Sequence, residues 1–223
     1  MDTVVIGCRT LENELRQAME ESGCSYDIKW FQSGLHDVPK KLHVALQELI
    51  DEAQRDGYVR ALLSMGYCGN SLAGLQTGEL TLIIPRVDDC ISFLLGSYKN
   101  RAELAKKDPS YFMTEGWLKG ERNIWREYEY AINKYGEETG KEIFDMMFGH
   151  YHSLAMLDTK SYDLTQTLKE SERIAKALNL EHKVIPGTIS YVKKLMTGPW
   201  DNEDFVTIPP HSTISEKDLT LKS

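Results

Sequence analysis

Short apolar runs rich in β-branched residues alternate with amphipathic segments along most of this chain of 223 residues. The run at residues 3–10 is followed by a segment, 11–23, in which Leu11, Leu15 and Met19 recur at helical spacing before a glycine. Strands separated by helices of this length pair in parallel, because a right-handed crossover connects them. The alternation therefore predicts an α/β fold with mainly parallel strands.

The same pattern continues through the rest of the sequence. Further strands are predicted over 26–34, 58–66, 80–87, 110–117, 152–159, 181–188 and 204–210, and further helices over 38–57, 88–107, 120–136, 141–151, 164–179 and 189–198. We place the seam between two Rossmann-like lobes at 106–112. The N-terminal lobe spans 1–107 and the C-terminal lobe 108–223, with a cleft at the carboxyl ends of the strands. One continuous sheet is the alternative, and the tail 211–223 is expected to be loose.

Charge and hydropathy limit the classes of partner. The net charge is −8 and the pI is about 5.3, which argues against a nucleic-acid partner, since such a partner needs a basic face. No apolar run approaches the roughly 18 residues of a membrane span, and the first residues lack the pattern of a secretory signal. We therefore expect a cytoplasmic protein without a membrane partner, whose four cysteines are thiols or metal ligands rather than disulfides.

Chemically active residue types recur where the predicted strands of the first half end. Cys8 ends the first strand, His36 follows the second, Cys68 follows the third and Cys90 follows the fourth. Ligands of open α/β sheets bind beyond the carboxyl ends of the strands, so these four side chains are expected along one edge of one sheet. Three thiols and an imidazole suit zinc or another transition metal. If only three of them bind, one position stays open for substrate.

A structural interpretation of these residues stays open. No CxxC or HExxH motif is present, small residues suit tight turns, and buried free cysteine is common. Cys90 could instead be a thiolate at a helix N-terminus, although Asp88 and Asp89 beside it would raise the pKa of its thiol. The two aspartates are the candidate catalytic residues, as a base or as groups that orient a ligand. Metal ligation and helix capping are the alternatives for them.

Four further residues are candidates for binding a cofactor or substrate. Arg9 and Arg86 adjoin strand ends and suit a carboxylate or a phosphate. Asn70 lies in the glycine-rich segment after the third strand, and Trp117 could form the wall of a pocket. Surface ion pairs for the arginines and a lid on the core for the tryptophan are the structural alternatives. No P-loop or GxGxxG motif is present, so a nucleotide is not expected.

Five stretches together resemble a prokaryotic family catalogued as domain of unknown function 1638 (DUF1638). They are LHDVPKKLH, GYCGNSLAGL, IPRVDDCISFLLGS, YFMTEGW and LMTGPWDNEDFVTIPP. His36, Cys68, Asp88, Asp89 and Cys90 lie within these stretches. The resemblance implies an association with anaerobic one-carbon metabolism and with corrinoid-dependent methyltransferase systems, and it makes a corrinoid a second candidate cofactor.

Three functions are compatible with these observations. The first is a metal-binding protein of one-carbon or methyl metabolism; as a methyltransferase-type enzyme, it would use zinc to lower the pKa of a bound thiol. The second is an accessory protein that binds a metal or a corrinoid-like cofactor for a methyltransferase partner, although the DxHxxG signature of cobalamin binding is absent. The third, a two-cysteine racemase, is disfavoured because no cysteine follows Cys90. The expected partners are a small-molecule ligand and a corrinoid or methyltransferase protein.

Overall fold

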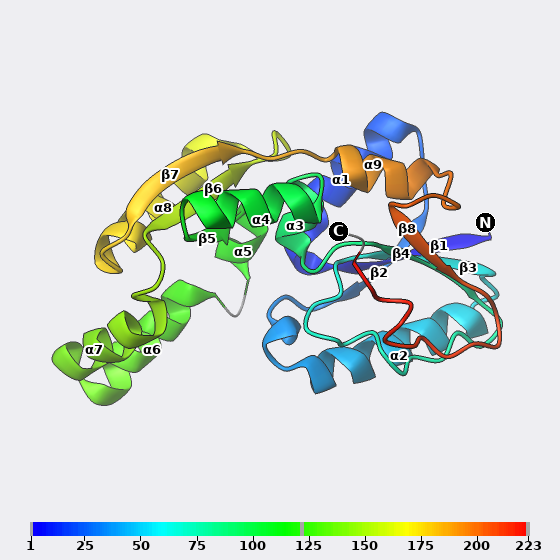
Figure 1. Cartoon of the computed structure of the whole chain (residues 1–223), viewed down its shortest axis with the longest axis horizontal. Helices are drawn as coiled ribbons and strands as arrows, with labels where there is room; N and C mark the ends of the chain where they lie inside the picture. Colours follow the sequence, from blue (N-terminus) through cyan, green and yellow to red (C-terminus); the bar gives the residue numbers. More distant parts are fainter. Residues whose placement is uncertain (1, 121–122, 222–223) are drawn as a thin grey trace.

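The strands are divided between two sheets, as the computed structural model of residues 2–120 and 123–221 shows (Figure 1). The first sheet has the order β2-β1-β3-β4-β8 and the second the order β5-β6-β7. All pairs are parallel except β4 with β8. The predicted α/β class with mainly parallel strands is therefore confirmed. The strands are β1 (Thr3–Cys8), β2 (Asp27–Phe31), β3 (Arg60–Ser64), β4 (Thr81–Pro85), β5 (Ser110–Met113), β6 (Ser153–Asp158), β7 (Glu181–Pro186) and β8 (Phe205–Ile208).

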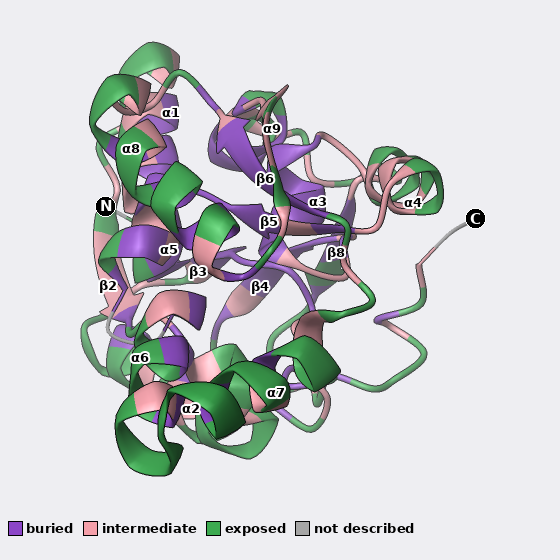
Figure 2. Cartoon of the chain, turned by 90° about the vertical axis from the view of Figure 1, so that its left-hand side faces the viewer, coloured by how far each residue is buried: buried purple, intermediate pink, exposed green. Residues whose placement is uncertain are grey.

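Helices cover both faces of the first sheet, with α2 on one side and α1 and α9 on the other (Figure 1). The helices are α1 (Glu12–Ser22), α2 (Pro39–Arg55), α3 (Cys90–Leu94), α4 (Tyr98–Lys107), α5 (Glu115–Lys119), α6 (Ile124–Tyr135), α7 (Glu137–Phe148), α8 (Leu164–Ala177) and α9 (Ser190–Thr197). All six residues of β1 are buried, because a parallel strand covered on both faces has no solvated side. Figure 2 shows this buried layer between helices with exposed outer faces.

The predicted helix over 88–107 is wrong, because two shorter helices, α3 and α4, occupy this segment. Gly96 separates them with a φ of +81°, a left-handed conformation that glycine adopts at little cost. The side chain of Ser97 then caps α4 by accepting a hydrogen bond from the backbone N–H of Asn100 at 3.1 Å. Two other predicted bounds were also wrong. The strand over 110–117 ends at Met113, where α5 follows, and the helix over 141–151 already begins at Glu137.

Replacing Ser97 with alanine is expected to lower the free energy of unfolding by about 1 kcal/mol, the usual cost of losing an N-cap. Equilibrium denaturant unfolding measures this loss. Ser190→Ala is the control, since Ser190 is an exposed serine at the start of α9 whose side chain makes no hydrogen bond to the described residues. Equal losses in the two variants would contradict the capping role.

The chain returns to the first sheet after β7. Helix α9 packs against α1, and β8 pairs with the edge of β4. The prediction of a loose tail is wrong, because residues 211–221 pack against the rest of the chain. Ile214 is buried and exchanges backbone hydrogen bonds with Gly74 and Leu75 at 2.8 and 2.9 Å. Burial of Ile214 and Leu219 explains the docking. Residues 222–223 of the predicted tail, and residues 121–122 of the helix over 120–136, lie outside the described residues. The division into lobes over 1–107 and 108–223 stays a prediction.

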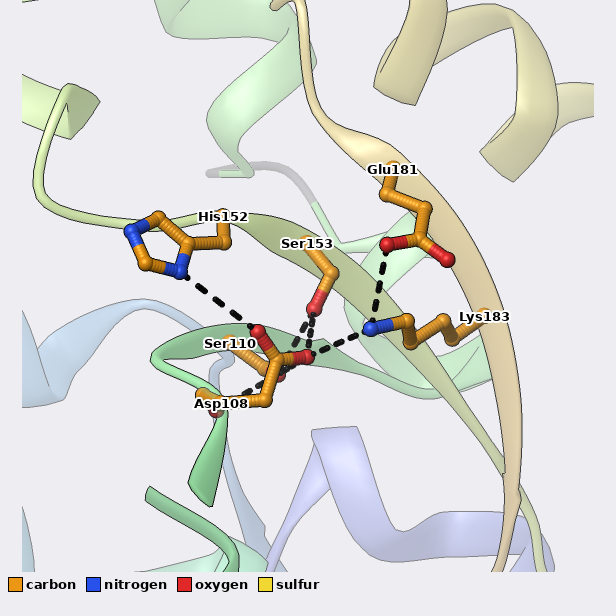
Figure 3. Close-up of polar contacts among 6 residues, drawn as sticks. All are labelled: Asp108, Ser110, His152, Ser153, Glu181 and Lys183. Carbon is orange, nitrogen blue, oxygen red and sulfur yellow. Dashed lines mark hydrogen bonds and ion pairs between the residues drawn. The ribbon is translucent and has the colours of Figure 1, made fainter. Parts of the chain in front are cut away.

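Asp108 connects the amino ends of strands in the second sheet (Figure 3). Its carboxylate accepts hydrogen bonds from Ser153 at 2.5 Å, Lys183 at 2.8 Å and Ser110 at 3.1 Å. The hydrogen bond from Lys183 is the main reason why the pKa of Asp108 is lowered to about 2. Nδ1 of His152 lies 3.8 Å from Oδ1 of Asp108. Because the carboxylate is engaged with three strands, we assign this cluster a structural role.

Candidate functional site

The carboxyl ends of three adjacent strands bring three cysteines together. Cys8 is the last residue of β1, Cys68 follows β3, and Cys90 is the first residue of α3, just after β4. The strands β1, β3 and β4 are neighbours in the first sheet, so the three thiols reach the same edge of the sheet. Cys24, in contrast, lies at the end of α1, where its thiol contacts the carbonyl of Met196 at 3.6 Å.

The segments that follow β3 and β4 run side by side, which places Cys68 next to Cys90. The backbone N–H of Cys68 donates to the carbonyl of Asp88 at 2.8 Å. Gly66 packs so closely on the backbone of Asp89 that a Cβ added at position 66 would lie 2.6 Å from it. A larger residue at position 66 would therefore force the two segments, and with them the two thiols, apart.

The thiols affect each other's ionisation. The neighbouring Cys90 thiol, together with burial, raises the pKa of Cys8 well above its ordinary value. The pKa of Cys90 is raised likewise, chiefly by the neighbouring Cys68 thiol. Both groups are thus neutral thiols at neutral pH, and only a nearby positive charge would favour their thiolate forms.

His36 and Trp117 complete a small cavity around the thiols. The cavity has a volume of about 10 Å³, and Cys8, His36, Cys68, Cys90 and Trp117 are among the residues that line it. That volume is about one probe sphere, the space of a single water molecule or ion. The ring of His36 lies 6.1 Å from that of Trp117, centroid to centroid. The four predicted metal ligands therefore share one cavity.

Trp117 reaches this cavity because α5 packs directly on the turn after β1. Gly116 lies against the backbone of Thr10, and a Cβ added at position 116 would be 1.9 Å from the Thr10 carbonyl oxygen. This close approach holds the following residue, Trp117, over the edge of the first sheet. The aromatic lining of the cavity thus comes both from the first sheet, through Phe31 of β2, and from Trp117 beyond the first four strands.

The backbone at Cys68 is strained. Its φ is +45°, followed by +68° at both Gly69 and Asn70. Glycine and asparagine tolerate this left-handed region, whereas for other L-residues it costs roughly 1–2 kcal/mol. A turn that needed only a small residue would be more stable with glycine at position 68. Strained backbone positions of this kind cluster at functional sites, which makes Cys68 a candidate for a functional thiol.

A wider cleft of about 300 Å³ opens next to the thiols. His36, Cys68 and Cys90 lie on one side of it, and Asp88 and Asp89 also line it. One oxygen of Asp89 caps α3 by accepting from the N–H of Ser92 at 2.7 Å, and Asp88 accepts a hydrogen bond from the Ser92 hydroxyl. Burial raises the pKa of Asp89. Helix capping thus applies to Asp89, while both carboxylates still face the cleft.

Three other predicted binding residues lie outside the cleft. Arg9 pairs with Glu12 at 2.9 Å and lines a separate groove. Arg86 donates to the carbonyls of Phe205, Asp218 and Thr220, which are structural contacts with β8 and the tail. Asn70 is exposed and contacts Glu216 at 3.4 Å. Of the four predicted cofactor-binding residues, the structure brings only Trp117 to the thiols.

The described side chains do not form a finished metal centre. No group of three or more His, Cys, Asp or Glu residues within 2–120 and 123–221 is arranged so that it could hold a metal ion. Cys8 donates instead to the hydroxyl of Thr10 at 3.3 Å, and Nε2 of His36 lies 3.3 Å from Oδ1 of Asp37. The donor types suit a thiophilic ion, but these two side chains would have to leave their present partners to bind one.

Several residues of the cleft were not among the predicted site residues. Arg101, Tyr111, Phe112 and Tyr151 line it. Arg101 belongs to a polar helix and Tyr111 and Phe112 to an apolar strand, so composition and spacing gave no reason to select them. The packing of α4 and β5 beside the first sheet brings Arg101, Tyr111 and Phe112 there, and Tyr151 comes from the segment between α7 and β6.

Fold and site define an α/β protein in which three cysteines gather around a small cavity next to a wider cleft. The family profile described as "protein of unknown function (DUF1638)" matches residues 30–196. The chain belongs to this family, as its sequence motifs predicted. The match includes His36, Cys68 and Cys90, whereas Cys8 precedes it. No curated protein and no solved structure matches the chain significantly.

Proposed function

We propose that this protein binds one thiophilic metal ion, with zinc as the first candidate, at the base of a cleft that admits a small ligand. Cys8, Cys68, Cys90 and His36 are the residues that would hold the ion. The observation that carries the proposal is their common cavity of about 10 Å³, which has the size of a single ion. A bound zinc ion would supply Lewis-acid chemistry and would lower the pKa of a coordinated thiol.

The wider cleft supports a small ligand rather than a large one. Its volume of about 300 Å³ is at the lower end of the range for small-molecule sites. Within the proposal, Asp88 and Asp89 face that ligand and would orient it or accept its proton. A methyltransferase reaction, or an accessory role for a methyltransferase or corrinoid partner, rests on the family resemblance. We retain both as proposals for this same cleft.

The unpaired cysteines are relevant to the cellular compartment of the protein. All four cysteines are unpaired by disulfides, which agrees with a reducing compartment, so we retain the proposal of a cytoplasmic protein. No helix in the described parts of the chain combines the length and apolar character that a membrane crossing needs.

Cobalt titration of anaerobically purified, metal-free protein tests the metal site. We expect one Co²⁺ per chain, with the thiolate-to-metal absorption of sulfur ligands, and competition by Zn²⁺. Cys90→Ser should weaken cobalt binding by more than about 100-fold, because losing a ligand exceeds the 10- to 100-fold effect of losing a second-shell contact.

Cys24→Ser is the matched control. Cys24 is a partly buried free cysteine that lies away from the cavity, and its replacement should leave the cobalt spectrum unchanged. Absence of stoichiometric binding by the wild type, or equal losses in Cys24→Ser and Cys90→Ser, would refute the proposed site.

A further inference from the structure

Arg101 is a cation in the wall of the cleft without a hydrogen-bond partner among the described residues. Its Nε is buried and makes no hydrogen bond. The nearest carboxylate is that of Asp89, whose Oδ2 lies 3.9 Å from Nε, too far for a hydrogen bond. A guanidinium offers five N–H donors in a planar fork, so this one has unused capacity.

The guanidinium is held in place at the cleft rather than free in solvent. Its carbon lies 4.4 Å from the ring centroid of Phe112, and the side chain is only 23% exposed. Both residues line the same cleft as Cys68 and Cys90. Stacking on an aromatic ring orients an arginine and leaves its N–H edge available for a planar anion.

From this geometry we infer that Arg101 binds the carboxylate of a small organic acid whose apolar part rests against Trp117 and Tyr111. The inference deepens the proposed function, since it rests on this cleft as the ligand site, but it does not require the metal. Cys68 and Cys90 line the same cleft as Arg101, so an acid bound at Arg101 shares the cleft with these two thiols.

The charge of the cleft favours a monoanion over a phosphate dianion. Asp88 and Asp89 face the same space as Arg101, so two carboxylates oppose one guanidinium. A second negative charge on the ligand would meet these carboxylates, while Arg101 is the one arginine or lysine among the described residues that line the cleft. A carboxylate, in contrast, matches the fork of the guanidinium in both shape and charge.

Titration of the metal-free full chain with benzoate tests the inference. The NMR signal of the Trp117 indole N–H reports the binding. Benzamide, the uncharged analogue, and inorganic phosphate are the comparison ligands. We expect saturable binding of benzoate, with benzamide weaker by about tenfold or more, as for loss of a charged hydrogen bond. Phosphate should also bind more weakly than benzoate.

Arg101→Met should weaken benzoate binding by about tenfold or more, while far-UV circular dichroism checks that the fold is retained. The matched control is Arg173→Met, because the Arg173 guanidinium also stacks on an aromatic ring, 4.1 Å from the centroid of Trp125, outside the cleft. Any of four results would overturn the inference. They are equal affinity for benzoate and benzamide, tighter binding of phosphate than of benzoate, absence of saturation, and unchanged benzoate affinity in Arg101→Met. Because no metal is present, its failure is distinguishable from failure of the metal site.

Discussion

Cys68→Gly is expected to abolish metal binding while leaving the fold as stable as the wild type or more stable. The φ of +45° at this position costs a cysteine roughly 1–2 kcal/mol that glycine does not incur. Glycine loses more backbone entropy on folding, by roughly 0.5–1 kcal/mol, so the net gain in the free energy of unfolding lies between about 0 and 1.5 kcal/mol. Loss of the thiol should reduce cobalt affinity by more than about 100-fold.

Asn70→Gly is the control for this experiment. Asn70 has a φ of +68° in the same turn but does not line the thiol cavity. It should change stability only slightly and leave the cobalt spectrum intact. If Cys68→Gly bound cobalt like the wild type, Cys68 would not be a ligand; if it lost about 1 kcal/mol or more of stability, the strain argument would be wrong.

Glu14→Gln is expected to stabilise the protein by about 3 kcal/mol at pH 8 and by little near pH 4.5. Glu14 is 1% exposed, and burial raises its pKa from 4.5 to about 7, with a smaller contribution from Glu115. One of its oxygens accepts from the Thr159 hydroxyl at 2.9 Å, and the other has no hydrogen-bond partner among the described residues. The pKa difference corresponds to about 3 kcal/mol at most.

The sign follows from proton binding. Between pH 4.5 and about 7 the folded protein holds a proton on Glu14 that the unfolded chain has released, so the wild type loses stability as the pH rises through this window. Glutamine cannot ionise, and the variant should lack this loss. Denaturant unfolding at several pH values measures it, with Glu20→Gln as the control on the exposed face of α1. Parallel pH profiles for wild type and Glu14→Gln would contradict the assignment.

Hydrophobic periodicity was sufficient to predict most of the fold. The β-branched runs at β1, β3 and β4 and the apolar spacing of α1 and α2 depend on local sequence alone. Parallel pairing of these strands then predicts that Cys8, Cys68 and Cys90 lie at one edge of the sheet. The structure brings these thiols and His36 around one cavity, although whether they bind a metal stays a prediction.

Features that depend on long-range packing were not predictable in this way. The break at Gly96 needs a left-handed backbone, and a single glycine in the sequence does not by itself predict that conformation. Docking of the tail depends on which distant hydrophobic residues pack against Ile214. Arg101 belongs to a helix with no buried residues, so nothing in its spacing marks it. For Arg86 the sequence predicted a binding residue that the structure does not place at the cleft. Arg86 lies beside a strand end and donates hydrogen bonds to backbone carbonyls of β8 and the tail.

Because the chain leaves its first sheet and later returns to it, the candidate metal donors and the aromatic residues that line the cleft come from different parts of the sequence. All four candidate metal donors precede residue 91, whereas Trp117, Tyr111 and Tyr151, which line the cleft, come from the excursion that builds β5 to β7. Substitutions within that excursion can therefore reshape what enters the cleft without touching the donor atoms. Within one family, such a division would let members keep the same cysteine and histidine side chains while the lining of the cleft diverges.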